Sequence, residues 1–314
     1  MKKTILILIL CCLLALPVIA DGANETEAVR LPIVMYHHMS PKARLWGDYV
    51  ISPEQFESDL QYLRAQGYTP ISTAELFAWY DGTGTLPEKP VMITFDDGYE
   101  STYVYAKPLL EKYGMPSVVS IIGSVAQQYS DTPDHMLDYS HMSWEAAADT
   151  DAGGLMEVQC HTWNMHKLEA RRGCGPTSGE SDEHYYNALS EDLNKFCQAY
   201  EQHIGHPCSV LALPFGMYTD RTLDYAGRLG FRAVLTCTEK VNLLTGDESE
   251  LMELCRYNRP SGISSEAFFA KWEKRAAVYR AFGSELRSQN TPFEKPWMRL
   301  SVSASSIRFW ASAQ

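Results

Sequence analysis

The chain has 314 residues and a formal net charge of −12, and 45% of its residues are hydrophobic. This length is enough for one large α/β domain or two smaller ones. Because nucleic-acid binding needs a basic surface, the acidic balance argues against a nucleic-acid partner.

Residues 1–20 have the pattern of a secretory signal peptide. Lys2 and Lys3 give a positive start, and an apolar stretch over 5–16 precedes a small-residue cleavage site. So short an apolar stretch does not predict a transmembrane anchor, which needs about 18 apolar residues or more. We expect 21–30 to be a flexible leader and the mature protein to be secreted or associated with the cell envelope.

The chain then alternates between apolar runs and helical patterns about seven times. This alternation favours one domain of parallel β/α units wound into a barrel, with a flat doubly wound sheet as the alternative. The predicted strands cover 31–36, 68–72, 90–95, 116–122, 156–160, 210–213 and 231–236. The predicted helices begin after Ser52, cover 74–80 and 101–113, begin again after Ser143, and cover 186–204 and 219–229. We expect this domain to span 31–285, with a C-terminal extension over 286–314.

Six cysteines follow the signal peptide, and an even number in an exported chain suggests disulfides. Of the 15 pairings that six cysteines allow, nearest neighbours are our prediction; buried free thiols are the alternative. The predicted pairs are Cys160–Cys174, Cys197–Cys208 and Cys237–Cys255.

Two stretches carry the chemistry. The buried strand at 90–95 ends on Asp96 and Asp97, whose side chains diverge, so one carboxylate can bind a metal while its neighbour moves protons. A later strand ends just before His161, and His166 follows five residues on. Two histidines and one carboxylate make a metal site with open positions for water and substrate.

The stretch Thr94-Phe95-Asp96-Asp97-Gly98, together with His161-Thr162 and His166, resembles the polysaccharide deacetylases (carbohydrate esterase family 4, the NodB-homology domain). The resemblance covers about 31–260. It implies a distorted (β/α)7 barrel, a single catalytic domain, and hydrolysis of N-acetyl groups on amino-sugar polymers.

The resemblance also assigns residues. Asp97, His161 and His166 match the ligands of one divalent metal, expected to be Zn²⁺ with Co²⁺ or Ni²⁺ as alternatives. Asp96 matches the catalytic base, and Phe215 matches the residue whose main-chain N–H faces the oxyanion. Thr162 is expected to form a hydrogen bond at the edge of the site.

Three departures from the family pattern point to one branch. The histidines are five apart rather than four, no arginine precedes Leu213, and no late Leu-x-x-His supplies the usual acid. These departures resemble the exported poly-N-acetylglucosamine deacetylases, which have a Tyr-His pair on the first strand. Tyr36-His37 matches that pair, so His37 is the expected general acid. Arg256 is a candidate to orient the base, although a surface salt bridge is equally consistent with the sequence.

The first hypothesis is therefore a secreted, metal-dependent N-deacetylase of an N-acetylglucosamine-containing polysaccharide. The second is a carbohydrate-binding protein on the same fold without useful catalysis. The third is a metal-dependent amidase acting on a small non-sugar substrate.

Overall fold

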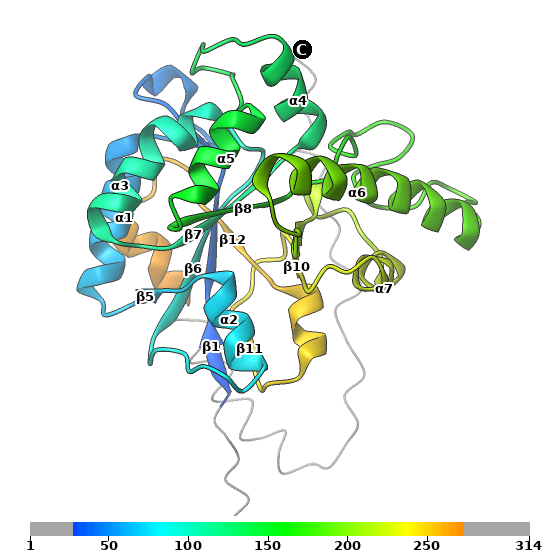
Figure 1. The fold of residues 1–314 in the computed structure, drawn as a ribbon. Helices are drawn as coiled ribbons and strands as arrows, with labels where there is room; N and C mark the ends of the chain where they lie inside the picture. The colour runs from blue at the N-terminus through cyan, green and yellow to red at the C-terminus, as the bar shows by residue number, and fades with distance from the viewer. Residues whose placement is uncertain (1–27, 273–314) are drawn as a thin grey trace, which may run out of the picture.

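The computed structural model describes residues 28–272, in which strands lie at the centre of the molecule with helices around them (Figure 1). The predicted signal peptide, most of the leader and the extension at 286–314 lie outside the described residues. The leader prediction is wrong at its end, because β1 (Val29–Leu31) pairs with β11 (Asn242–Leu244). Within 28–272, no helix is long and apolar enough to cross a bilayer.

Parallel strands form the centre of the molecule. Their spatial order is β10 (Ala233–Leu235), β9 (Val210–Ala212), β8 (Met156–Cys160), β7 (Ser117–Ile121), β6 (Pro90–Phe95), β2 (Ile33–Tyr36) and β12 (Tyr257–Asn258). Short strands at the periphery are β3 (His38–Met39), β4 (Val50–Ile51) and β5 (Thr69–Pro70).

The segment that ends in β12 closes the sheet into a barrel. Leu254 donates its N–H to Val234 O at 2.9 Å and accepts from Thr236 N at 2.8 Å, which joins the segment to β10. A few residues later, Tyr257 pairs with Val34 on β2. One short segment therefore bonds to strands on both sides, and the predicted distorted (β/α)7 barrel is confirmed. The alternative of a flat sheet is wrong.

Helices cover the outside of the barrel (Figure 1). The α-helices are α1 (Pro53–Ala65), α2 (Thr73–Tyr80), α3 (Lys107–Tyr113), α4 (Gly123–Asp131), α5 (Trp144–Ala152), α6 (Asp182–Ile204) and α7 (Asp220–Arg228). Shorter helical turns are η1 (Ala43–Leu45), η2 (Thr102–Ala106), η3 (Pro214–Gly216) and η4 (Glu248–Glu253). Ser52 begins α1 as predicted, since its side chain accepts from Gln55 N at 3.0 Å.

Side chains alternate between the two faces of each strand. On β6, Val91 and Ile93 pack in the outer core with the helices, whereas Met92 packs in a separate inner cluster with Leu76 of α2. Because the period of a strand is two residues, Asp96 continues the inner face that begins at Met92. On β8, Cys160 belongs to the outer core, so its neighbour His161 is directed inward.

The predicted disulfides are absent, and all six cysteines within the described range are free thiols. Cys160 interacts with Cys208 rather than with Cys174. The Cys237 thiol interacts with Arg256 rather than with Cys255. Cys160 and Cys237 thus interact with residues other than the next cysteine in the chain. The alternative of free thiols describes this structure.

A buried ion pair ties α1 to the end of the closing segment. Arg259 donates to both Asp59 oxygens at 2.8 and 2.9 Å, and both side chains have no exposed surface. Tyr36 OH donates to the same carboxylate at 3.0 Å. Removal of one charge would leave the other buried and uncompensated.

We expect Asp59→Asn to lower the free energy of unfolding by about 3–5 kcal/mol, because Arg259 would keep its charge in the core. Urea denaturation measures this change. Asp224→Asn is the matched control, since Asp224 is 64% exposed in its pair with Arg228 and should change stability by less than about 0.5 kcal/mol. Equal effects of the two substitutions would contradict this assignment.

Candidate metal and catalytic site

A pocket of about 180 Å³ lies where the parallel strands end. Because all the strands of a parallel barrel point the same way, the residues that follow them meet at one end. The lining residues are Met35, His37, Tyr49, Asp96, Asp97, His161, His166, Phe215, Cys237, Glu239 and Asn258.

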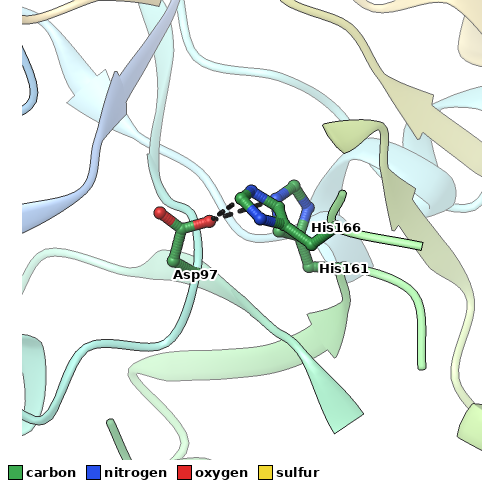
Figure 2. Close-up of side chains that lie close together, drawn as sticks. All are labelled: Asp97, His161 and His166. Atoms are coloured by element: carbon green, nitrogen blue, oxygen red, sulfur yellow. Dashed lines mark ion pairs between the residues drawn. The ribbon is translucent and has the colours of Figure 1, made fainter. Parts of the chain in front are cut away.

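Three of these side chains converge on one point (Figure 2). Asp97 Oδ1 lies 3.3 Å from His161 Nε2 and 3.1 Å from His166 Nε2. The donor atoms of the three residues all lie within 4.8 Å of one another. The sequence prediction that separate strand ends bring these residues together is confirmed, and the cluster could hold a metal ion.

The donor set fits a divalent ion. His161 Nδ1 lies 2.9 Å from Ala212 O, a contact that requires the proton on Nδ1 and leaves the Nε2 lone pair facing Asp97. Asp97 Oδ1 is buried and receives no hydrogen bond of good geometry from the part of the chain that the structure describes. Although burial raises the pKa of Asp97, the charge of His166 and contacts with both imidazoles hold it well below its ordinary value. A buried carboxylate beside two imidazoles is a typical divalent-metal ligand set.

The backbone at this site is in an uncommon conformation. Within residues 28–272, the non-glycine residues with positive φ are Asp97 (70°), Thr162 (70°) and Phe215 (58°). They follow strands β6, β8 and β9, and Asp97 and Phe215 line the pocket. Left-handed backbone in a non-glycine residue costs about 1–3 kcal/mol and is concentrated at functional sites. Three strand ends therefore have a strained backbone, and this conformation sets the direction of the turns that follow them.

Asp96 lies next to the metal cluster but is held by a different partner. Arg256 Nη1 and Nη2 donate to its two carboxylate oxygens, each at 2.7 Å. Arg256 has no exposed surface, so the alternative of a surface salt bridge is wrong. Burial raises the pKa of Asp96, but the charge and hydrogen bonds of Arg256, together with the nearby His161 and His37, outweigh it and leave the pKa below its ordinary value. Asp96 is thus a carboxylate at neutral pH.

The two first-strand histidines have different surroundings. His37 lines the pocket 4.9 Å from the Tyr49 ring, and its buried Nδ1 has no hydrogen-bond partner within residues 28–272. Burial lowers the pKa of His37. His38 is turned away from the pocket, with its Nδ1 2.8 Å from Ser101 Oγ, and burial lowers its pKa to about 4. Of the pair, His37 is the residue that can meet a substrate.

Phe215 belongs to η3, directly after β9. Its ring lies 4.3 Å from the His166 ring, so the predicted oxyanion turn contacts a residue of the metal cluster. Gly173, in the loop after His166, lies so close to Pro214 that an added Cβ would be 2.6 Å from Pro214 O. The loop with His166 and the turn with Phe215 are therefore packed together.

Two predicted substrate residues do not line the pocket. Tyr36 is 1% exposed and directs its hydroxyl to Asp59 in the outer core, because it lies on the outer face of β2. Thr162 is fully buried, and its Oγ1 accepts from Met165 N at 3.1 Å. Tyr36 is directed away from the pocket, and Thr162 forms its hydrogen bond in the turn that leads to His166, so their roles toward substrate stay predictions.

Sequence reasoning missed five residues of the pocket. Met35 lies on β2, Tyr49 precedes β4, Cys237 and Glu239 follow β10, and Asn258 ends β12. For Cys237, Glu239 and Asn258 the signal is position, since residues at the ends of barrel strands reach the same end as Asp96. For Asn258 that signal was hidden, because β12 has only two residues.

We expect His166→Ala to weaken Zn²⁺ or Co²⁺ binding by at least about 100-fold, because one of three ligands is lost. Calorimetric titration of the metal-stripped protein measures this affinity. His184→Ala is the matched control, since His184 is 75% exposed and pairs with Glu180 on the surface. Unchanged affinity in His166→Ala would remove this residue from the ligand set.

Comparison with known proteins agrees with this geometry. The polysaccharide deacetylase family profile matches residues 83–234. The poly-beta-1,6-N-acetyl-D-glucosamine N-deacetylase of Escherichia coli (strain K12) is 30% identical over 142 residues, 42% of this chain and 20% of that protein. The enzyme of the same name from Staphylococcus aureus (strain MRSA252) is 27% identical over 194 residues, 62% of this chain and 63% of that protein. The chain thus spans less than two thirds of either relative.

Solved structures show the same fold. The structure of IcaB from Ammonifex degensii superposes with a TM-score of 0.63 at 27% identity, covering 81% of this chain and 97% of that one. The profile match contains both aspartates, both histidines and Phe215. The chain contains a polysaccharide deacetylase domain over residues 83–234.

Proposed function

We propose that this protein is a metal-dependent N-deacetylase that removes acetyl groups from an N-acetylglucosamine-containing polysaccharide. The observation that carries the proposal is the division of work between two adjacent carboxylates. Asp97 faces His161 and His166, whereas Asp96 is bound by Arg256 and lines the same pocket. Amide hydrolysis needs both a Lewis acid and a separate base.

Asp96 is the proposed base. Arg256 grips both of its oxygens and keeps it ionised, so it can accept a proton from a water in the pocket. A divalent ion held by Asp97, His161 and His166 supplies Lewis acidity and lowers the pKa of water when it is bound. The low exposure of both aspartates, 2% and 4%, strengthens these electrostatic effects.

The N–H of Phe215 and the ring of His37 complete the proposed mechanism. A preorganised main-chain donor at the developing oxyanion is worth about 3 kcal/mol, and the left-handed turn at Phe215 is the candidate for it. Since burial lowers the pKa of His37, its ring is neutral near pH 7. The ring must therefore take up a proton before it passes one to the departing amine. The number of protons balances, because Asp96 removes one proton from water and the amine gains one.

The substrate class is proposed from the names of the relatives and from the site. Both bacterial relatives are poly-beta-1,6-N-acetyl-D-glucosamine N-deacetylases by name. The pocket holds about 180 Å³, which suits an acetamido group rather than a whole sugar. Tyr49 lines the pocket and is 41% exposed, so its ring offers a face for a sugar ring. We also propose that a signal peptide at 1–20 directs export of a catalytic domain over 31–285. An exported enzyme would meet a polysaccharide outside the cell.

The structure supports the hypothesis of a binding protein without catalysis less well than the sequence alone does. It rested on an arginine and a late histidine that the motifs lack. Arg256 now supplies a guanidinium to the proposed base, and His37 supplies an imidazole to the pocket. The groups required for hydrolysis are all at one end of the barrel.

We expect Asp96→Asn to lower the rate of acetate release from N-acetylglucosamine oligomers by about 10²–10⁴-fold, because an amide cannot take the proton. Metal content, measured by elemental analysis, should stay at the wild-type level. Loss of metal together with activity would instead mean that Asp96 is a ligand.

Asp138→Asn is the matched control for that experiment. Asp138 forms surface pairs with Lys42 and Arg44 at 2.8 Å and should release acetate at the wild-type rate. Acetate release by Asp96→Asn at the same rate as Asp138→Asn would refute the base assignment. Small N-acyl amides tested in parallel separate a polysaccharide deacetylase from a small-molecule amidase.

A further inference from the structure

The four residues between the two histidines of the metal cluster determine where the second histidine lies. We call residues 162–165 the ligand turn. Two of its main-chain N–H groups are bound by side chains of the same stretch. Thr162 N donates to Cys160 Sγ at 3.2 Å, and Met165 N donates to Thr162 Oγ1 at 3.1 Å. The two N–H groups in the middle of the ligand turn are bound by a residue from another element.

Asp192 binds these two N–H groups with both of its carboxylate oxygens. Trp163 N donates to Oδ1 at 2.7 Å, and Asn164 N donates to Oδ2 at 2.8 Å. Burial raises the pKa of Asp192, and the two N–H bonds act against that rise. The ligand turn therefore compensates for the burial of this carboxylate, and the carboxylate in return fixes two consecutive peptide groups of the turn.

Asp192 lies on α6, a helix of 23 residues whose buried face packs in the outer core. Leu189 and Phe196 have no exposed surface, and they lie three residues before and four residues after Asp192. Because residues three and four apart share one side of a helix, Asp192 is directed toward the body of the protein. The two acceptor oxygens are thus carried by a well-packed helix rather than by a loop.

The carbonyl groups of the ligand turn are bound by α4. Gly123 N donates to Thr162 O at 3.0 Å, and the next N–H, that of Ser124, donates to Trp163 O at 2.8 Å. The Trp163 ring lies between the two helices. Lys195 Nζ of α6 is 4.4 Å from its centroid, and a Cβ added at Gly123 would be 2.6 Å from its Cε3 atom. The ligand turn is therefore held from both sides, with its carbonyls on α4 and its N–H groups on α6.

We propose that Asp192 is a positioning residue of the metal site, which holds the ligand turn so that His166 faces His161 and Asp97. The inference rests on the proposed function, because it concerns the metal that the proposed reaction needs. His161 directly follows β8, whereas His166 lies at the far end of the ligand turn. His166 Nε2 lies 3.1 Å from Asp97 Oδ1, and this approach depends on the course of the turn.

The expected effect of Asp192 is on metal affinity. Metal ligands have to be held within about 0.5 Å of the productive geometry. Residues that orient such ligands without binding the metal typically contribute about 10–100-fold to its affinity. Asp192 does this through the main chain at positions 163 and 164 rather than through a histidine ring.

Calorimetric titration of the metal-stripped full chain with Zn²⁺ or Co²⁺ tests the proposal. Asp192→Asn keeps the shape of the side chain but turns one acceptor oxygen into an amide N–H₂ group, which faces an N–H of the ligand turn. We expect this variant to weaken metal binding about tenfold or more. Asp192→Ala removes both acceptors and should weaken metal binding at least as much.

Glu191→Gln is the matched control, because Glu191 is the preceding residue on α6, is exposed, and loses the same charge. It should change the affinity less than twofold. Hydrogen exchange in the metal-free proteins separates positioning from a general loss of stability. The amides of Trp163 and Asn164 should exchange faster in both Asp192 variants than in Glu191→Gln, whereas the amides of β8 should keep their wild-type rates.

Circular dichroism verifies that each variant is folded at the temperature of the titration. The proposal is overturned if folded Asp192→Asn and Asp192→Ala bind the metal as tightly as Glu191→Gln, or if exchange at positions 163 and 164 does not change. Absence of metal binding in the wild-type protein would refute the proposed metal dependence itself, and this inference with it. The two failures are distinguishable, because one is seen in the wild-type protein and the other only in the variants.

Discussion

Two adjacent carboxylates, almost fully buried, impose the main constraint on this structure. Asp96 and Asp97 are 2% and 4% exposed, and two negative charges so placed need two positive partners. Arg256 provides one of them through a bidentate pair with Asp96. Asp97 faces two imidazoles instead, an arrangement that a divalent cation completes. The closing segment of the barrel carries Arg256, so closure of the fold and the charge balance of the site depend on the same few residues.

Much of the fold could be predicted from the sequence, because buried parallel strands are short apolar runs bounded by turn residues. Strand β8 was predicted with the bounds that the structure has, and Ser143 does begin α5. Helix α4 was missed, since Gly123 begins it and its apolar positions are few. The closing segment was missed as well: β12 is two residues long, and it pairs with β2, which lies more than 200 positions away in the chain.

The candidate site was predictable for a different reason. Strand ends identify which residues meet, and a two-histidine, one-carboxylate set identifies what they can bind. Burial is not readable in the same way, so the sequence could not distinguish a surface pair from the fully buried Arg256. The strand face on which a residue lies explains two other differences between prediction and structure. Tyr36 points to the outer core, and so does Cys160, whose thiol neighbour is Cys208, just before β9, rather than Cys174, the next cysteine in the chain.

The central claim is that the two aspartates divide the work, one holding a cation and the other left to move protons. Anomalous diffraction from a crystal grown with Zn²⁺ or Co²⁺ tests it most directly. The account predicts one peak at about 2.0–2.2 Å from Asp97 Oδ1 and from Nε2 of His161 and His166, with Asp96 still paired to Arg256. A peak coordinated by Asp96, or no peak between the two rings, would contradict it.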